Sequence, residues 1–282
     1  EKTGFSKKEI YNLLGDTSRE YRVYTIPKSD GGKRTICEPS DAMKKLQTAV
    51  SETVKNGGFV ERFATAYENG SSVKSNAARH IDGEHVLHAD IKNFFPSITR
   101  EMFFAAYKKS LKNNEQDLDF LWRIVSYQGG LPIGASTSPF IANRVMRRID
   151  KKLGRVGFFI TYTRYADDMI FSSKKRLKPS LIAKVEKILT EEGFSLNRKK
   201  TYFMTNRKEI TGVIITDAKK LSVGTAYKKR LKSEIYNLLV KQQGNINHVR
   251  GRYAHLKFIE PAYARRLKAK YSGLDSIGFF KK

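Results

Sequence analysis

The sequence predicts an α+β fold, and three observations carry that prediction. Short runs of aromatic and β-branched residues separated by polar breaks indicate antiparallel hairpins, most clearly across residues 162–172. Segments with apolar residues three and four positions apart indicate helices that pack on those strands, as across residues 139–153. The length of 282 residues suits one or two domains, each with a buried core.

The charge balance is strongly basic. The chain has 54 Lys and Arg residues against 28 Asp and Glu, and the net charge of +26 is spread along its whole length. A partner with a dense phosphate backbone would balance this charge, although a ribosome-like basic protein would share it. A single cysteine, Cys37, excludes an internal disulfide. No apolar run approaches the roughly 18 residues of a membrane helix and no secretory signal is recognisable, so we expect a cytoplasmic protein without membrane contact.

The N-terminal segment predicts a helix, a hairpin and a second helix. Residues 5–15 have helical spacing, while residues 21–26 and 33–37 form two strands joined by a Gly-rich turn. Ser40 is placed to cap the helix that follows. Lys28 and Arg34 flank the hairpin turn, which is either a solvated basic turn or a clamp for phosphate oxygens.

The middle of the chain alternates strands, helices and a Gly-rich loop. An apolar strand over residues 86–91 carries Asp90 near its end, and Thr99 is placed to cap the next helix. Another helix is expected over residues 117–127. After the Gly-rich loop, Ser138 followed by Pro is typical of a cap and first turn, here of the helix 139–153.

The last third begins with a helix and ends with basic helices. Residues 181–189 have helical spacing, and a strand is expected over residues 210–215, with Thr211-Gly212 near its start. From about residue 218 the pattern is helical and strongly basic. Such helices suit the binding of a duplex through its phosphates.

Two adjacent aspartates, Asp167 and Asp168, stand between the strands of the 162–172 hairpin. Aspartate is a common turn residue, so the pair by itself fits an ordinary polar turn. Two neighbouring carboxylates repel each other, however, and hard divalent cations prefer such oxygen ligands. With Asp90 placed beside the turn, three carboxylates would surround two cations, which is the arrangement for in-line nucleotidyl transfer.

These segments resemble the reverse transcriptases. Tyr-Ala-Asp-Asp at 165–168 is similar to the catalytic hairpin of that family, and Asp90 with Phe-Phe-Pro-Ser at 94–97 is similar to its first aspartate motif. The similarity continues in order along nearly the whole chain. Asn-Ala-Ala-Arg-His at 76–80 and Ile-Thr-Gly at 210–212 resemble the NAxxH and VTG elements of the bacterial retron enzymes.

The resemblance implies a right-hand polymerase with fingers, a palm built on an antiparallel sheet, and a helical thumb. We expect the fingers at 1–80 and 100–137, the palm at 81–99 and 138–217, and the thumb at 218–282.

The resemblance also implies a set of catalytic residues. Asp90, Asp167 and Asp168, with the backbone carbonyl of Ile91, would hold two Mg²⁺ ions, for which Mn²⁺ is a substitute. Lys200 would protonate the pyrophosphate leaving group, which is general-acid chemistry. Lys199 is the rival for that role, and a solvated basic loop is the alternative.

Further residues are expected to bind nucleotide and nucleic acid. Lys28 and Arg34 would close on the incoming triphosphate, Phe95 would exclude a 2′-hydroxyl, and Tyr165 would lie near the primer end or the sugar. Ile133 stands where the family usually has Gln, which puts one nucleotide contact in question. The expected contacts of the thumb with a duplex are Lys228, Lys229, Arg230, Arg250 and Arg252.

The retron resemblance implies that the enzyme uses dNTPs to copy a structured non-coding RNA, which serves as template and primer. The product would be RNA-linked branched single-stranded DNA (msDNA), made in anti-phage defence with an effector protein. A group II intron or diversity-generating reverse transcriptase would share the motifs. An RNA-dependent RNA polymerase would also use paired carboxylates, although Phe95 argues against it. A catalytically idle RNA-binding scaffold is the alternative outside the enzymes.

Overall fold

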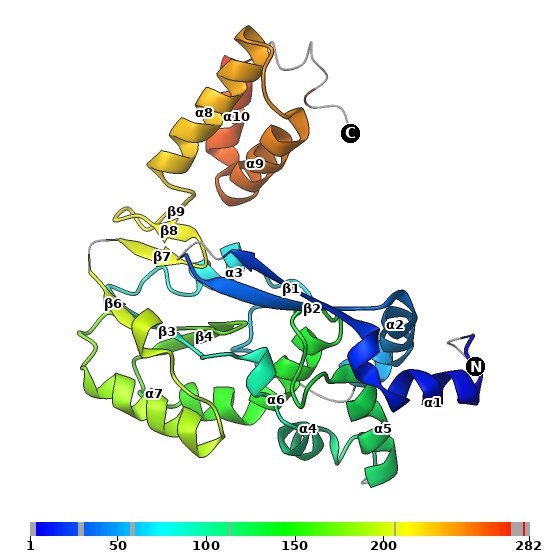
Figure 1. Ribbon diagram of the computed structural model, residues 1–282. Helices are drawn as coiled ribbons and strands as arrows, with labels where there is room; N and C mark the ends of the chain where they lie inside the picture. The colour runs from blue at the N-terminus through cyan, green and yellow to red at the C-terminus, as the bar shows by residue number, and fades with distance from the viewer. Residues whose placement is uncertain are drawn as a thin grey trace.

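The computed structural model describes residues 4–27, 31–56, 60–112, 114–205, 207–271 and 279, and its elements follow one another as in Figure 1. The mixture of helices and antiparallel strands confirms the α+β class. In chain order, the helices and strands are α1 (Lys7–Gly15), β1 (Tyr21–Pro27), β2 (Lys33–Pro39), α2 (Asp41–Asn56), α3 (Val73–Ala78), β3 (His85–Asp90), α4 (Arg100–Tyr107), α5 (Glu115–Val125), α6 (Ser138–Leu153), β4 (Thr161–Tyr165), β5 (Asp168–Ser173), α7 (Ser180–Glu191), β6 (Tyr202–Met204), β7 (Lys208–Ile210), β8 (Val213–Ile215), β9 (Leu221–Ser222), α8 (Thr225–Val240), α9 (Ile246–Ile259) and α10 (Pro261–Lys270).

The central element is a sheet with the strand order β4-β5-β3-β6, antiparallel throughout the described residues. Successive residues of a strand point to opposite faces. Leu87 of β3 and Phe171 of β5 therefore pack into the core with α6 and α7, while Val86 and Ile170 belong to a second core on the other face. Asp90 and Asp168 have the parity of Val86 and Ile170, so both lie on that second face.

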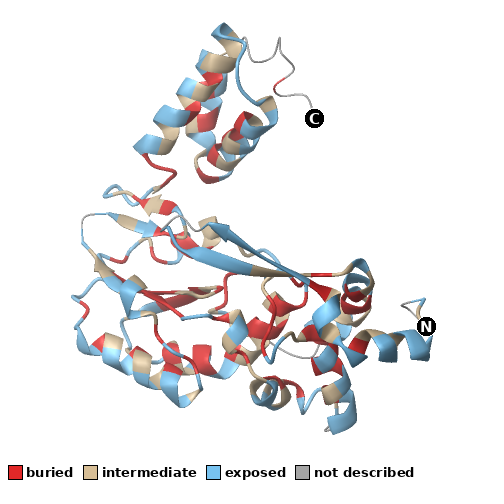
Figure 2. Ribbon diagram, viewed as in Figure 1, coloured by how far each residue is buried: buried red, intermediate tan, exposed pale blue. Residues whose placement is uncertain are grey.

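The hairpin β1–β2 crosses above the body of the molecule and is mostly exposed (Figure 2). Its base is anchored, because the Cys37 amide donates to the Ile133 carbonyl at 2.8 Å. Gly134 makes this contact close, since a Cβ there would lie 2.9 Å from the Cys37 carbonyl oxygen. Ser40 caps α2 as predicted, accepting a bond from the Met43 amide at 3.1 Å.

Two sequence-based expectations about local structure are wrong. The single strand expected over 210–215 is a hairpin, because Thr211 (φ 47°) and Gly212 (φ 80°) both take the left-handed backbone that a two-residue turn requires. Ser138 does not cap α6; it lies inside the helix, and its hydroxyl donates to the Pro132 carbonyl at 2.8 Å.

Helices α8, α9 and α10 form a lobe at the far side of the β7–β8–β9 sheet (Figure 1). Leu231, Val249 and Leu256 are buried at its centre. The domain boundaries expected from the sequence stay a prediction. Within the described ranges, no helix combines the length and the apolar character needed to cross a bilayer.

Candidate polymerase active site

Three acidic residues from two distant segments meet at one end of the central sheet. Asp90, the last residue of β3, lies directly opposite Asp168, the first residue of β5. Asp167 occupies the turn between β4 and β5, and its carbonyl accepts a bond from the Ile91 amide at 3.0 Å. The structure thus brings the turn and the end of β3 together across 77 residues of sequence, as the motif analysis expected.

A buried arginine, Arg164, holds the turn that carries Asp167. Ala166 has a left-handed backbone (φ 56°), which is unfavourable for a residue other than glycine. Its carbonyl accepts a bond from the Arg164 guanidinium at 3.0 Å. Arg164 is fully buried and forms a two-pronged ion pair with Asp150 at 2.9 and 2.7 Å. This buried pair fixes the turn against the α6 helix.

The electrostatics of the acidic residues favour a bound cation. Burial and the neighbouring Asp168 carboxylate raise the pKa of Asp167 to about 6. Burial also raises the pKa of Asp90, although bonds from Asn197 and the charge of Lys200 oppose that effect. Among the described residues, no three His, Cys, Asp or Glu side chains are already gathered as ligands. Positive charge between the carboxylates would relieve their mutual repulsion, so the donor set fits hard divalent ions.

His88 is a residue of this site that the sequence analysis did not assign. Its Nε2 lies 2.9 Å from Asp168 Oδ1, and its Nδ1 lies 2.8 Å from the Lys200 carbonyl oxygen. Burial acts to lower the pKa of His88, but the bonds and charge of Asp168 and the Lys200 carbonyl outweigh it, and the net shift is upward. Only its position two residues before Asp90, on the same strand face, could have indicated this role.

The segment after α7 lies beside Asp90. The Asn197 side chain donates to Asp90 Oδ1 at 2.8 Å, and its amide donates to the Asp90 carbonyl at 2.8 Å. Lys200 Nζ lies 4.0 Å from Asp90 Oδ2, close enough for its charge to reach the site. Asn197 was not selected from the sequence, because an Asn in a basic loop carries no spacing signal.

The structure places the residues expected to meet the nucleotide in different ways. Tyr165 is half-buried and pairs with Asp168 across the β4–β5 hairpin. Phe95 is half-buried, with its ring centroid 5.2 Å from that of the buried Phe94. Arg34 is exposed on β2. Lys28 lies outside the described residues.

Tyr67 lies within electrostatic range of both Arg34 on the β1–β2 hairpin and Asp167, and the sequence analysis did not select it. Its backbone is left-handed (φ 63°), and 46% of the residue is exposed. Burial raises its pKa, the charges of Asp167 and Tyr165 add to that rise, and Arg34 opposes it. A bulky residue held in this backbone region next to carboxylates points to a role at the site rather than in folding.

The NAxxH and ITG elements meet on the second face of the sheet. The Asn76 amide group donates to Thr211 Oγ1 at 3.4 Å, and Thr163 donates to Asn76 Oδ1 at 2.6 Å. His80 lies fully buried between Thr163 and Ser172, 2.7 Å from each hydroxyl. The two short elements therefore form one polar network under β4 and β5.

Comparison with known proteins decides the family. Residues 26–242 match the family described as Reverse transcriptase (RNA-dependent DNA polymerase). The chain is 32% identical to Retron Ec83 reverse transcriptase of Escherichia coli, over 96% of this chain and 92% of that protein. It is 30% identical to Retron Ec86 reverse transcriptase of Escherichia coli, over 97% of this chain and 87% of that protein. The chain belongs to the retron reverse transcriptases. It is an RNA-directed DNA polymerase.

Solved structures agree on the fold of this reverse transcriptase. A telomerase from Candida albicans aligns with a TM-score of 0.55 and 11% identity, over 96% of this chain and 59% of that one. A foamy viral protease-reverse transcriptase aligns with a TM-score of 0.54 and 16% identity, over 96% of this chain and 44% of that one. The expected right-hand polymerase fold is confirmed.

The Lys and Arg side chains expected to contact a duplex in the C-terminal lobe of this reverse transcriptase differ in their solvent exposure. Lys228 is largely buried in an ion pair with Glu260 at 2.6 Å, and Arg252 lies 3.3 Å from Glu234. These two residues do not cover the outer surface as expected from the sequence. Lys229 and Arg230 are exposed on α8, whereas Arg250 donates to the Phe279 carbonyl at 2.8 Å.

Proposed function

We propose that this reverse transcriptase copies a structured non-coding RNA into RNA-linked branched single-stranded DNA, with that RNA as template and primer. Identity of about 30% to named retron enzymes over most of their length supports the proposal. We further propose that it acts in the cytoplasm, in anti-phage defence with an effector protein.

Asp90, Asp167, Asp168 and the Ile91 carbonyl are the proposed ligands of two Mg²⁺ ions, with Mn²⁺ as a substitute. The observation that carries this assignment is the pairing of Asp90 with Asp168 beside the Asp167 turn. Ions bound there would activate the primer hydroxyl and neutralise charge on the leaving pyrophosphate. The chain itself orients the carboxylates through His88 and Asn197.

The remaining roles are proposed from the sequence motifs, and for Lys200 also from its distance to Asp90. Lys200, 4.0 Å from the Asp90 carboxylate, is the proposed donor of a proton to the leaving group. Arg34, with Lys28, is proposed to bind the triphosphate of the dNTP, and Tyr165 to contact the sugar or primer end. Phe95 is the proposed barrier to a 2′-hydroxyl.

The thumb, palm and fingers are proposed at the boundaries expected from the sequence, with Lys228, Lys229, Arg230, Arg250 and Arg252 assigned to the duplex contact. Because Lys228 and Arg252 are half-buried in ion pairs, direct phosphate binding falls first to Lys229, and then to Arg230, whose side chain pairs with Glu234 at 3.0 Å but is 65% exposed. Both are exposed, and phosphate contacts of this kind position a duplex without reading its sequence.

The test is extension of an RNA-templated primer by Asp167→Ala. We expect extension to be lost while binding of the template RNA stays within about twofold of wild type. Asp41→Asn, which changes an acidic side chain that is 96% exposed, is the matched control and should extend normally. Retained synthesis by Asp167→Ala would refute the assignment of the site.

The retron product is tested separately. Nucleic acid that copurifies with the wild-type protein from cells should contain DNA covalently joined to RNA, and that species should be missing with Asp167→Ala. Purely unlinked DNA from an active enzyme would favour the group II intron or diversity-generating alternative.

A further inference from the structure

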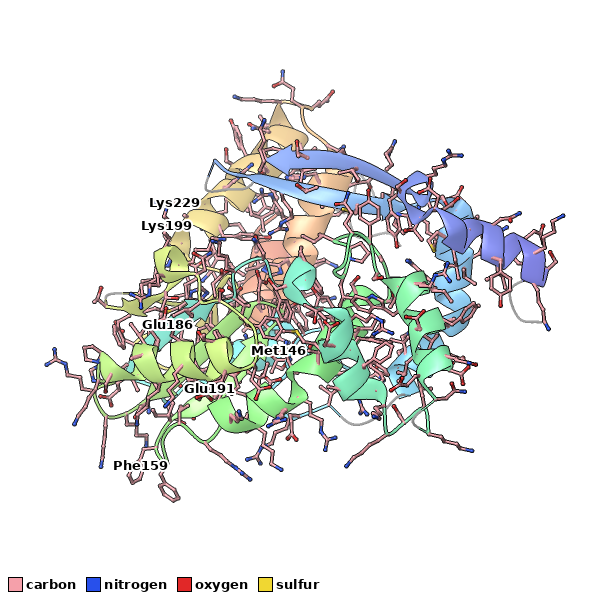
Figure 3. The ribbon with its side chains drawn as sticks, turned by 60° about the horizontal axis from the view of Figure 1, so that its bottom comes forward. Met146, Phe159, Glu186, Glu191, Lys199 and Lys229 are labelled. Atoms are coloured by element: carbon pink, nitrogen blue, oxygen red, sulfur yellow. The ribbon has the colours of Figure 1, made fainter. Side chains whose placement is uncertain are left out.

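Two phenylalanines project from the tight turn that leads into β4. Phe158 is 95% exposed and Phe159 is 64% exposed. Their rings are perpendicular, with centroids 5.1 Å apart. Figure 3 shows Phe159 projecting from the edge of the molecule. Large aromatic side chains usually dominate cores and interfaces, so an adjacent pair with most of its surface in water points to a ligand.

The turn itself does not require these residues. The Ile160 amide donates to the Gly157 carbonyl at 3.2 Å, so Phe158 and Phe159 occupy its two central positions. Such positions favour Gly, Asn, Asp, Ser or Pro. Ile160 packs against the core, and a Cβ at Gly157 would lie 2.9 Å from the Ile160 side chain. The backbone is therefore held in place, and the two rings are presented to solvent on a fixed base.

The surroundings of the pair are cationic. The segments 155–161 and 174–178 contain no acidic residue, and β-pairing of Thr161 with Ser172 brings them together. Lys175 Nζ lies 4.4 Å above the Phe159 ring centroid. The cations of these two segments, all exposed, are Arg155, Lys174, Lys175, Arg176 and Lys178.

One acidic residue, Asp82, lies within electrostatic range of Lys174. The charge of Lys174 helps to lower the pKa of Asp82, but the Asp82 carboxylate is already paired with Lys219 at 2.8 Å. The charge of Glu84 also helps to raise the pKa of Lys219. The patch of Phe158, Phe159 and the flanking cations, which we name the aromatic patch, therefore combines base-sized apolar faces with exposed positive charge.

The aromatic patch is remote from the carboxylates. Strand β4 runs from Thr161 beside the patch to Tyr165 at the catalytic turn. The four residue steps from Thr161 to Tyr165 cover about 13 Å, and Phe158 and Phe159 lie further back along the chain. A nucleotide stacked on Phe158 or Phe159 thus cannot be the substrate at the Asp167 turn, and the patch needs a ligand of its own.

We propose that the aromatic patch binds unpaired nucleotides of single-stranded RNA, with bases stacked on Phe158 and Phe159 and phosphates on the flanking Lys and Arg side chains. Aromatic faces with basic neighbours bind single strands in this way, whereas bases inside a duplex cannot reach the rings. A protein partner fits less well, because its interface would desolvate the Lys175 ammonium over the ring, and lysine is depleted from such interfaces. The proposal does not depend on the retron product proposed above.

The test uses the full chain saturated with an unlabelled blunt RNA–DNA duplex, so that the polymerase cleft is occupied. Binding of a fluorescein-labelled single-stranded oligouridylate is then followed by fluorescence anisotropy. We expect the oligouridylate to bind the loaded wild type, and Phe158→Ala/Phe159→Ala to weaken it at least about fivefold. Tyr11→Ala, which removes an aromatic residue 64% exposed on α1, is the control and should bind as wild type.

Three outcomes decide the proposal. Failure of the loaded wild type to bind the oligouridylate would overturn it. Unchanged affinity in the double variant would also overturn it and would leave the patch as a protein-docking face. Asp167→Ala should retain oligouridylate binding, so loss of polymerase activity and loss of the patch are distinguishable. Because both phenylalanines are exposed, the double variant should keep the wild-type melting temperature and primer extension.

Discussion

His88 donates to one carboxylate oxygen of Asp168 while holding the backbone carbonyl of Lys200 on its other side, at 2.9 and 2.8 Å. A carbonyl oxygen and an ionised carboxylate both only accept hydrogen bonds, so the two contacts form together in the doubly protonated imidazolium, the form that the raised pKa of His88 favours. The ring stacks on Tyr202, with centroids 5.1 Å apart. One imidazole thereby orients an acidic residue of the proposed metal site and the segment that carries the proposed general acid.

Replacing His88 should disturb the use of metal more than the fold. We expect His88→Ala to lower the rate of primer extension by about 10- to 100-fold and to raise the Mg²⁺ concentration at half-maximal rate, since partners that orient metal ligands contribute this much. The measurement is the extension rate as a function of Mg²⁺. His85→Ala, at an exposed position of the same strand, is the control. An unchanged Mg²⁺ requirement in His88→Ala would rule out the orienting role.

The buried pair of Arg164 and Asp150 should be important for stability. Arg164→Met leaves the Asp150 carboxylate buried without its counter-charge, and we expect a loss of about 3–5 kcal/mol in the free energy of unfolding by urea. Adding Asp150→Leu should recover part of that loss, because the uncompensated carboxylate is removed. Arg148→Met, at a side chain 79% exposed, should change stability by less than about 1 kcal/mol. Equal effects of the two arginine substitutions would contradict the prediction.

His80 should make the fold sensitive to mild acid. Burial lowers its pKa to about 3. The unfolded chain, with a His pKa of about 6.5, binds a proton first, so the contribution of His80 is complete above that value and is lost as the pH falls. Between pH 7 and pH 5 the loss is about 2 kcal/mol. In urea unfolding at both pH values, His80→Gln should remove this component; an identical pH dependence in wild type and variant would contradict it.

Phe95 should control the choice of sugar. Its side chain is half-buried beside the buried Phe94, so Phe95→Ala opens space near the proposed sugar position without removing the inner ring. We expect the preference for dNTPs over rNTPs to fall by about tenfold or more, since the rejection is steric. Single-nucleotide incorporation with dCTP and CTP measures it. Unchanged discrimination would exclude Phe95 from contact with the sugar.

The fold class and the main motifs were within reach of sequence reasoning because their signals are local. A run of mostly apolar residues predicted the strand into Asp90, and aromatic and β-branched runs around a polar break predicted the hairpin around Asp167. The same reasoning merged the β7–β8 hairpin into one strand. A run of apolar residues around Thr211-Gly212 does not reveal that both turn residues adopt a left-handed backbone.

The partners of the acidic residues depended on the tertiary structure. His88 meets the Lys200 carbonyl only because β6 pairs beside β3, and Asn197 reaches Asp90 across 107 residues of sequence. The sequence predicted Lys228 and Arg252 to be surface cations. Packing of the helices in the C-terminal lobe instead places Glu260 beside Lys228 and Glu234 beside Arg252. Periodicity and turn chemistry are properties of neighbouring residues, and the chain alone determines them. Hydrogen bonds between distant side chains require a particular strand register and helix packing, which only the folded molecule defines.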